Sequence, residues 1–329
     1  MMEILEEVEL CFPQLLNASC KKPMRTHFEF ILSYVTLSSI TVITTTLNLL
    51  VIISIAHFKQ LQTPTNLLLL SLAVSDFFVG LLMFFQIILI DGCWFLGDLM
   101  CTLYYVLDYT ITSTSVGSMV LISIDRYVAI CDPLHYSTKV TKNRVQVCVC
   151  LCWICSVIFQ VLVLSDNLKQ PGRYNSCSGE CVVVNNYIAG LVDLVVSFIG
   201  PVTVIIVLYV KVFVVAVSQA RAMRSHIAAI TLQGSVKVTA KKSEMKAART
   251  LGVVVVVFLI CFSPYYCVAL PGDNLLNASS DAFVLCLFYF NSCLNPLIYA
   301  LFYPWFRKCL KLVVTLQILQ PGSSETNVL

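Results

Sequence analysis

Three aspartates, Asp76, Asp108 and Asp193, lie inside long apolar stretches of the sequence. A carboxylate in the hydrocarbon region of a membrane costs several kcal/mol unless it is paired or hydrated, so each is a candidate functional residue. A buried, unpaired carboxylate tends to take up a proton, and a cationic ligand is the natural partner that keeps it charged. Neither a base–nucleophile pair nor a metal cluster accompanies them in the sequence, which argues against an intramembrane enzyme.

Membrane helices must position these carboxylates. Hydrophobic residues make up 58% of the 329 residues and charged residues only 12%, and the mean hydropathy of +0.87 is too high for an ordinary soluble domain. We therefore predict an all-α membrane protein. Stretches long enough to cross a bilayer as helices lie at roughly 31–56, 66–90, 99–130, 146–165, 187–215, 247–270 and 282–303.

Lysine and arginine predict the orientation of these helices. Five of the 21 such residues fall on the side of the N-terminus and sixteen on the other side, which should be cytoplasmic. The N-terminus is therefore expected outside, with the sequons at Asn17 and Asn277 placed for glycosylation. The first ten residues hold no basic segment of the kind that begins a cleavable signal peptide, so the first span should act as its own insertion signal. The net charge of +3 reflects the cytoplasmic excess and does not indicate a nucleic-acid partner.

The last apolar stretch carries a distinctive pattern. Pro296 lies inside it, where a proline removes a backbone hydrogen bond and kinks the helix, with Asn295 beside it and Tyr299 about one turn on. The segment that follows has the composition of a helix lying on the membrane surface, with Tyr303, Trp305, Phe306, Arg307 and Lys308.

Residues 291–306 resemble the Asn-Pro-x-x-Tyr end of rhodopsin-like G-protein-coupled receptors. The longer pattern Asn-Ser-x-x-Asn-Pro-x-x-Tyr-x-x-x-Tyr-x-Trp-Phe is similar to that of trace amine-associated receptors at every fixed position. The resemblance implies a seven-transmembrane-helix bundle at 31–303, after an extracellular tail at 1–30 and before a short amphipathic helix and cytoplasmic tail at 304–329. It also implies a fish-type olfactory amine receptor of the plasma membrane. Its partners would be membrane lipid, a stimulatory heterotrimeric G protein and arrestin.

The same resemblance assigns the ligand site. Asp108 matches the aspartate that pairs with the ligand ammonium in aminergic receptors, and Tyr289 the tyrosine that hydrogen-bonds to it; the alternative is a structural aspartate satisfied by tyrosines. Asp193 stands where catecholamine receptors usually carry serine, as in fish receptors that recognise diamines or bind amines in an inverted pose. Either each aspartate binds one ammonium group, or Asp193 alone holds a monoamine, or it only hydrates the pocket. The expected lining is Tyr109, Thr112, Ser197, Tyr265 and Tyr266, whose aromatic faces suit cation–π contacts.

The resemblance also implies a sodium site and an activation switch, and no required cofactor. Asp76 would hold a sodium ion with Ser115, Asn291, Ser292 and Asn295, or be held by hydrogen bonds without an ion. The switch residues would be Arg126, its ionic-lock partner Glu244, the supporting Tyr209 and Tyr299, and Phe262. Phe262 replaces the tryptophan usual in the family, which puts in question how efficiently ligand binding reaches the cytoplasmic face.

Sixteen cysteines remain to be assigned. An oxidising compartment favours disulfides on the outer side, and the resemblance implies the pairs Cys101–Cys181 and Cys20–Cys177. Cys11 and Cys93 are left without a partner. The run Cys148, Cys150, Cys152 and Cys155 has no histidine or carboxylate nearby, which favours small apolar packing residues over a metal site.

Two other functions remain as alternatives. A monoamine such as a phenylethylamine or indoleamine could be the ligand. More remotely, the chain could be an amine transporter, although no paired repeat of broken helices is visible. A retinal photoreceptor is excluded because the seventh stretch has no lysine for a Schiff base.

Overall fold

The computed structural model describes residues 9–15, 17–22, 26–229, 252–253, 255–267, 278–302 and 304–328. Within these ranges, only the backbone is described at 219–229, 278–282 and 299–302.

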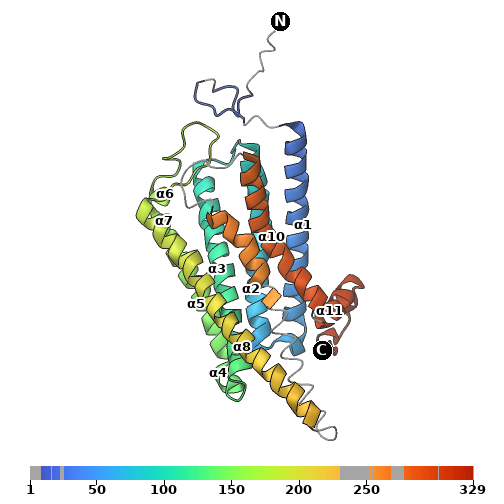
Figure 1. Cartoon of the computed structure of the whole chain (residues 1–329). Coiled ribbons are helices and arrows are strands. Elements are labelled where there is room, and N and C mark those ends of the chain that lie inside the picture. Colours follow the sequence, from blue (N-terminus) through green and yellow to red (C-terminus); the bar gives the residue numbers. More distant parts are fainter. Residues whose placement is uncertain are drawn as a thin grey trace.

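Long helices run side by side through the molecule (Figure 1). The bundle contains α1 (His27–His57), α2 (Pro64–Asp91), α3 (Asp98–Cys131), α5 (Lys142–Val163), α7 (Tyr187–Asp193), the π-helical η2 (Leu194–Ile199), α8 (Gly200–Ala229) and α10 (Ala278–Phe302). The elements α7, η2 and α8 follow one another without a break and form one long helix. In the part of the chain that the structure describes, five helical stretches are long and apolar enough to cross a bilayer, and shorter apolar helices lie at Val255–Cys267 and Phe283–Ile298.

Local sequence signals explain where these helices begin and end. Thr26 accepts a hydrogen bond from the backbone N–H of Glu29, and the Glu29 carboxylate accepts one from the N–H of Thr26. This capping box starts α1 at His27, before the predicted boundary at 31. Thr63 caps α2 ahead of Pro64, and Gly92 ends α2 in the left-handed conformation at φ 80°.

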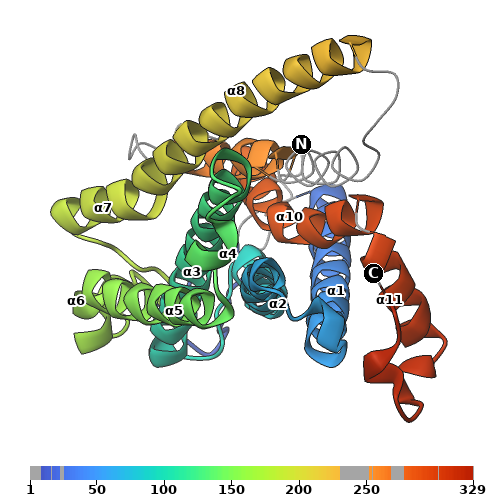
Figure 2. The same cartoon turned by 90° about the horizontal axis from the view of Figure 1, so that it is seen from below.

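The bundle buries polar residues together with its apolar core, and it exposes large apolar residues on its outer faces. Thr44, Asn48 and Asp76 are 0% exposed, whereas Phe84 and Phe213 are 60% and 69% exposed. Soluble proteins rarely expose apolar surface on this scale, so the outer faces suit lipid. Viewed from below, α2 lies between α1 and α3 (Figure 2).

The remaining elements are short and lie at the two ends of the bundle. The element α11 (Pro304–Val314) follows α10 directly and packs against α1 at the lower end (Figures 1 and 2). Its Trp305, Phe306 and Cys309 are buried, and Arg307 and Lys308 are exposed. The others are η1 (Lys59–Leu61), α4 (Tyr136–Lys139), α6 (Ser165–Lys169), η3 (Gln317–Leu319) and η4 (Ser323–Glu325).

Candidate functional site

A cavity of about 460 Å³ opens between α3, α5, α7, η2, the 255–267 helix and α10. It brings together every residue that sequence reasoning assigned to the ligand site. The lining comprises Asp108, Tyr109, Thr112, Ser113, Gln160, Asn185, Asn186, Tyr187, Gly190, Leu191, Asp193, Leu194, Ser197, Tyr265, Tyr266, Leu285, Phe288 and Tyr289.

Asp108 forms the α3 wall of the cavity. Its side chain is buried, and its Oδ1 accepts a long hydrogen bond of 3.4 Å from the hydroxyl of Tyr289 on α10. The nearby Tyr104 hydroxyl donates instead to Oε1 of Gln86, at 2.7 Å. No residue in the described part of the chain donates to Oδ2 of Asp108, so this oxygen can serve a ligand.

Asp193 forms a second acidic wall at the end of α7. Its Oδ1 accepts hydrogen bonds from the Ser197 hydroxyl at 2.7 Å and from Nε2 of Gln160 at 3.1 Å. The π-helical turn that begins after Asp193 carries Ser197, and such turns are frequent at functional sites. Gln160, on α5, was missed by sequence reasoning, although an amide in an apolar helix was the available signal.

Aromatic rings form the third wall and continue below the cavity. Tyr266 stacks on Phe198 with ring centroids 4.1 Å apart, and Tyr265 lies 4.8 Å from Phe288. Phe262 is buried between Phe258 and Phe288, at 4.5 Å from each. Phe288 therefore touches both the cavity and Phe262.

A second polar centre surrounds the fully buried Asp76. Its Oδ1 accepts hydrogen bonds from Ser115 (3.2 Å) and Ser292 (2.8 Å), and its Oδ2 from Nδ2 of Asn295 (2.7 Å). Asn291 is buried but is not among these donors. The Oδ1 atoms of Asn291 and Asn295 are buried and accept nothing from the described residues. This set of carboxylate, hydroxyl and amide oxygens fits a small hard cation.

Comparisons with known proteins identify the family. Residues 47–299 match the family model described as 7 transmembrane receptor (rhodopsin family). The chain is 39% identical to trace amine-associated receptor 13c of Danio rerio, over 97% of this chain and 96% of the relative. It is 35% identical to receptor 4 of Mus musculus (98% and 96%) and 37% identical to receptor 6 of Pan troglodytes (99% and 97%). The chain belongs to the trace amine-associated receptors of the rhodopsin family. Their family is one of receptors and not of enzymes.

In this family member, Arg126 of α3 is held by its own neighbours at the lower end of the bundle. It forms an ion pair with Asp125, with Nε 2.9 Å from Oδ2, and donates to the Thr65 hydroxyl at 2.8 Å. Asp125 also accepts from the Tyr136 hydroxyl at 2.8 Å.

The structure describes only some of the other predicted switch residues. Glu244 lies outside the described residues, and the side chain of Tyr299 is not described. Tyr209 lies on α8, where its ring faces Gly252: a Cβ added at Gly252 would lie 3.8 Å from Cε1 of Tyr209.

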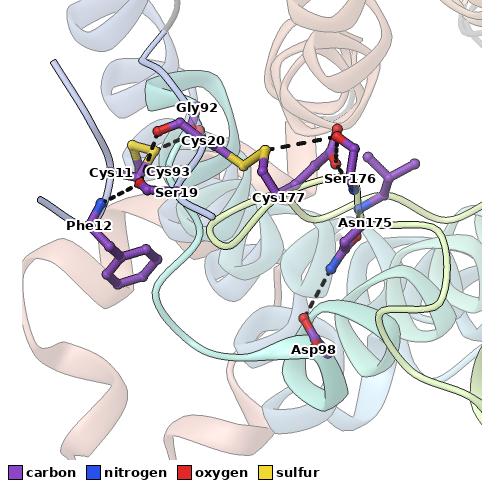
Figure 3. Close-up of a disulfide and its surroundings, with 12 residues drawn as sticks. Cys11, Phe12, Ser19, Cys20, Gly92, Cys93, Asp98, Asn175, Ser176 and Cys177 are labelled. Atoms are coloured by element: carbon purple, nitrogen blue, oxygen red, sulfur yellow. Dashed lines mark hydrogen bonds between the residues drawn. A yellow bond between two sulfur atoms is a disulfide. The ribbon is translucent and has the colours of Figure 1, made fainter. Parts of the chain in front are cut away.

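Disulfides fasten the N-terminal segment to the upper end of the bundle, called the disulfide end below (Figures 1 and 3). The bridges are Cys101–Cys181, Cys20–Cys177 and Cys11–Cys93. The first two are the pairs that the resemblance implied. The third joins the two cysteines that sequence reasoning left without a partner. Asn17 is exposed at this end, and Asn277 lies outside the described residues. Cys148, Cys150, Cys152 and Cys155 are free thiols on α5.

Proposed function

We propose that this receptor binds small amines, with diamines preferred, and signals through a stimulatory heterotrimeric G protein. The observation that carries the proposal is the presence of two carboxylates, Asp108 and Asp193, in one cavity. A diamine supplies one ammonium group to each. A monoamine leaves one carboxylate unpaired, and breaking a buried pair costs on the order of 3–5 kcal/mol. Hydration of the half-buried Asp193 reduces this difference. The names of the relatives support an amine as the ligand.

A monoamine at Asp108 is the second candidate. The hydrogen bonds that Ser197 and Gln160 donate to Asp193 favour it, because they stabilise that carboxylate without a ligand.

A cyclic-AMP reporter in cells that express the receptor tests the proposal. Asp108→Ala should abolish most responses to amines. Asp193→Ala should weaken the response to diamines far more than the response to monoamines. Asp98→Asn, which removes a carboxylate from the first turn of the same α3, is the matched control and should leave both responses intact. Equal loss of both ligand classes in the two cavity variants, or activation of the native receptor by monoamines alone, would contradict the diamine preference.

The topology is part of the proposal. We place residues 1–30 outside the plasma membrane, the seven-helix domain at 31–303, and a surface helix and tail at 304–329. The disulfide end would face the oxidising exterior. On α11, buried Trp305 and Phe306 alongside exposed Arg307, Lys308 and Lys311 support contact with anionic lipid. Arrestin and an olfactory role rest on family resemblance. Asn17→Gln should remove a glycosidase-sensitive mobility shift if this end lies outside.

A further inference from the structure

Two buried oxygen acceptors on residues that line the cavity are left unused. Gln160 is 1% exposed, and its Oε1 accepts no hydrogen bond from any described residue. Oδ1 of Asn185 is also buried and likewise accepts none within the described ranges. Both residues line the cavity. Because leaving a buried acceptor unpaired destabilises a protein, two such acceptors in one cavity point to a ligand that donates hydrogen bonds.

The orientation of the Gln160 amide follows from its partner. A carboxylate only accepts hydrogen bonds, so the amide nitrogen must face Asp193. The same nitrogen lies 3.4 Å from the Ser197 hydroxyl oxygen. If the amide were flipped, Oε1 would contact Oδ1 of Asp193, and two acceptors in contact repel each other. Oε1 is therefore the atom left for another donor.

Asp193 supplies a third acceptor. Both of its hydrogen bonds end on Oδ1, and no residue in the described part of the chain donates to Oδ2. A primary ammonium group carries three N–H donors, one for each of these three oxygens. We infer that Asp193, Gln160 and Asn185 form a site selective for a primary ammonium group. The inference rests on the proposed diamine function and adds the chemistry of one end of the ligand.

The two ends of the cavity should then tolerate N-methylation differently. A dimethylated ammonium group keeps its charge but only one N–H donor. Among the described residues that line the cavity, only Gln160 and Asn185 have unpaired buried acceptors. The Asp108 end should therefore select a ligand group mainly for its positive charge and not for its number of N–H donors. A diamine with one dimethylated end can place that end at Asp108. A diamine dimethylated at both ends cannot satisfy the three-acceptor site.

The test uses straight-chain α,ω-diaminoalkanes from diaminopropane to diaminooctane in the cyclic-AMP reporter. The most potent chain is compared with its derivatives dimethylated at one end and at both ends. On the native receptor the singly modified compound should stay within about threefold of the parent, and the doubly modified one should lose about tenfold or more, as expected for lost charged hydrogen bonds.

Two variants and a control assign this selectivity to the named oxygens. Asn185→Ala removes an acceptor that no described residue uses, so the fold should survive, and the parent should lose about tenfold while the doubly modified compound changes little. Gln160→Leu should act in the same direction. Gln146→Leu makes the same change at an exposed position of α5 that does not line the cavity, and it should preserve the native ratio.

The outcomes separate the inference from the proposed function. Equal potency of the three compounds on the native receptor overturns the inference, as does an unchanged ratio in both cavity variants. In these cases a diamine response that depends on Asp193 leaves the proposed function standing. Failure of the native receptor to respond to any amine overturns both.

Discussion

At the residue scale, the cluster around Arg126 shows how a buried charge is kept in place. Asp125 accepts from Arg126, Thr65 and Tyr136, so that the carboxylate is fully engaged. Hydrogen bonds to charged groups are worth about 1.5–3 kcal/mol each, and together they restrain the guanidinium group.

Neutralising Asp125 should release this restraint. Asp125→Asn is expected to raise basal cyclic AMP severalfold at equal surface expression, because Arg126 loses its ionic partner. Asp132→Asn is a suitable control: hydrogen bonds from Lys139 and His135 hold the pKa of the half-buried Asp132 carboxyl down to about 2, and those residues, not Arg126, contact it. A basal level that does not change in Asp125→Asn would show that the restraint lies elsewhere.

The Asp76 centre makes a separate prediction about sodium. If an ion is held by this oxygen set, replacing sodium by a large organic cation should change amine affinity in the native receptor, and Asp76→Asn should abolish that dependence. Competition binding in the two salts at equal ionic strength measures it. Identical sodium dependence in native receptor and variant would leave Asp76 as a purely structural residue.

At the scale of elements, α1 and α2 approach each other at a glycine. A Cβ added at Gly80 would lie 2.5 Å from Oγ1 and 3.0 Å from the backbone nitrogen of Thr45. Real Cβ atoms do not tolerate the shorter contact, so the two helices owe their close packing to the missing side chain.

Gly80→Ala should therefore destabilise the bundle by about 1–3 kcal/mol through overpacking. Heating the detergent-solubilised receptor and following the monodisperse fraction measures the effect. Gly190→Ala is the matched control, because a Cβ at this helical position meets nothing within 4 Å and should be neutral or slightly stabilising. Equal melting temperatures for the two variants would contradict the close approach.

At the scale of the whole molecule, Cys11–Cys93 and Cys20–Cys177 tie the N-terminal segment to the disulfide end, and Cys101–Cys181 joins α3 to the segment between α6 and α7. Figure 3 shows Cys11–Cys93 and Cys20–Cys177 close together. The Ser19 hydroxyl beside them accepts a hydrogen bond from the N–H of Phe12 and donates one to the carbonyl oxygen of Cys20. Cys11 and Cys93 are 82 residues apart in sequence, but the path between them is shorter through the other two bridges.

That shorter path determines how much stability should be lost when the Cys11–Cys93 bridge is removed. It is roughly 20 residues long, for which the chain-entropy model gives about 3 kcal/mol. The double variant Cys11→Ser with Cys93→Ser should therefore melt at a lower temperature than the native receptor, whereas Cys148→Ser, which removes a free thiol, should not. Peptide mapping without reduction should recover the Cys11–Cys93 pair in the native protein; a different partner for Cys11 would refute the arrangement.

Sequence by itself determined the family and the apolar helices that the structure describes, and it singled out the acidic residues that line the cavity. Apolar run length and the positions of proline, threonine and glycine specify helices locally, and Asp108 and Asp193 are conspicuous because a charge in an apolar helix is rare. The pattern at 291–306 was sufficient to indicate the family that the comparisons then showed.

Tertiary structure decided what depends on distance between residues remote in sequence. The Cys11–Cys93 bridge could not be derived, because cysteine positions alone do not fix connectivity. The contact between Gln160 and Asp193 depends on how α5 packs beside α7. The unpaired oxygens of Gln160 and Asn185 appear only when every neighbour is in place, since hydrogen-bond satisfaction is a property of the packed cavity and not of the residue.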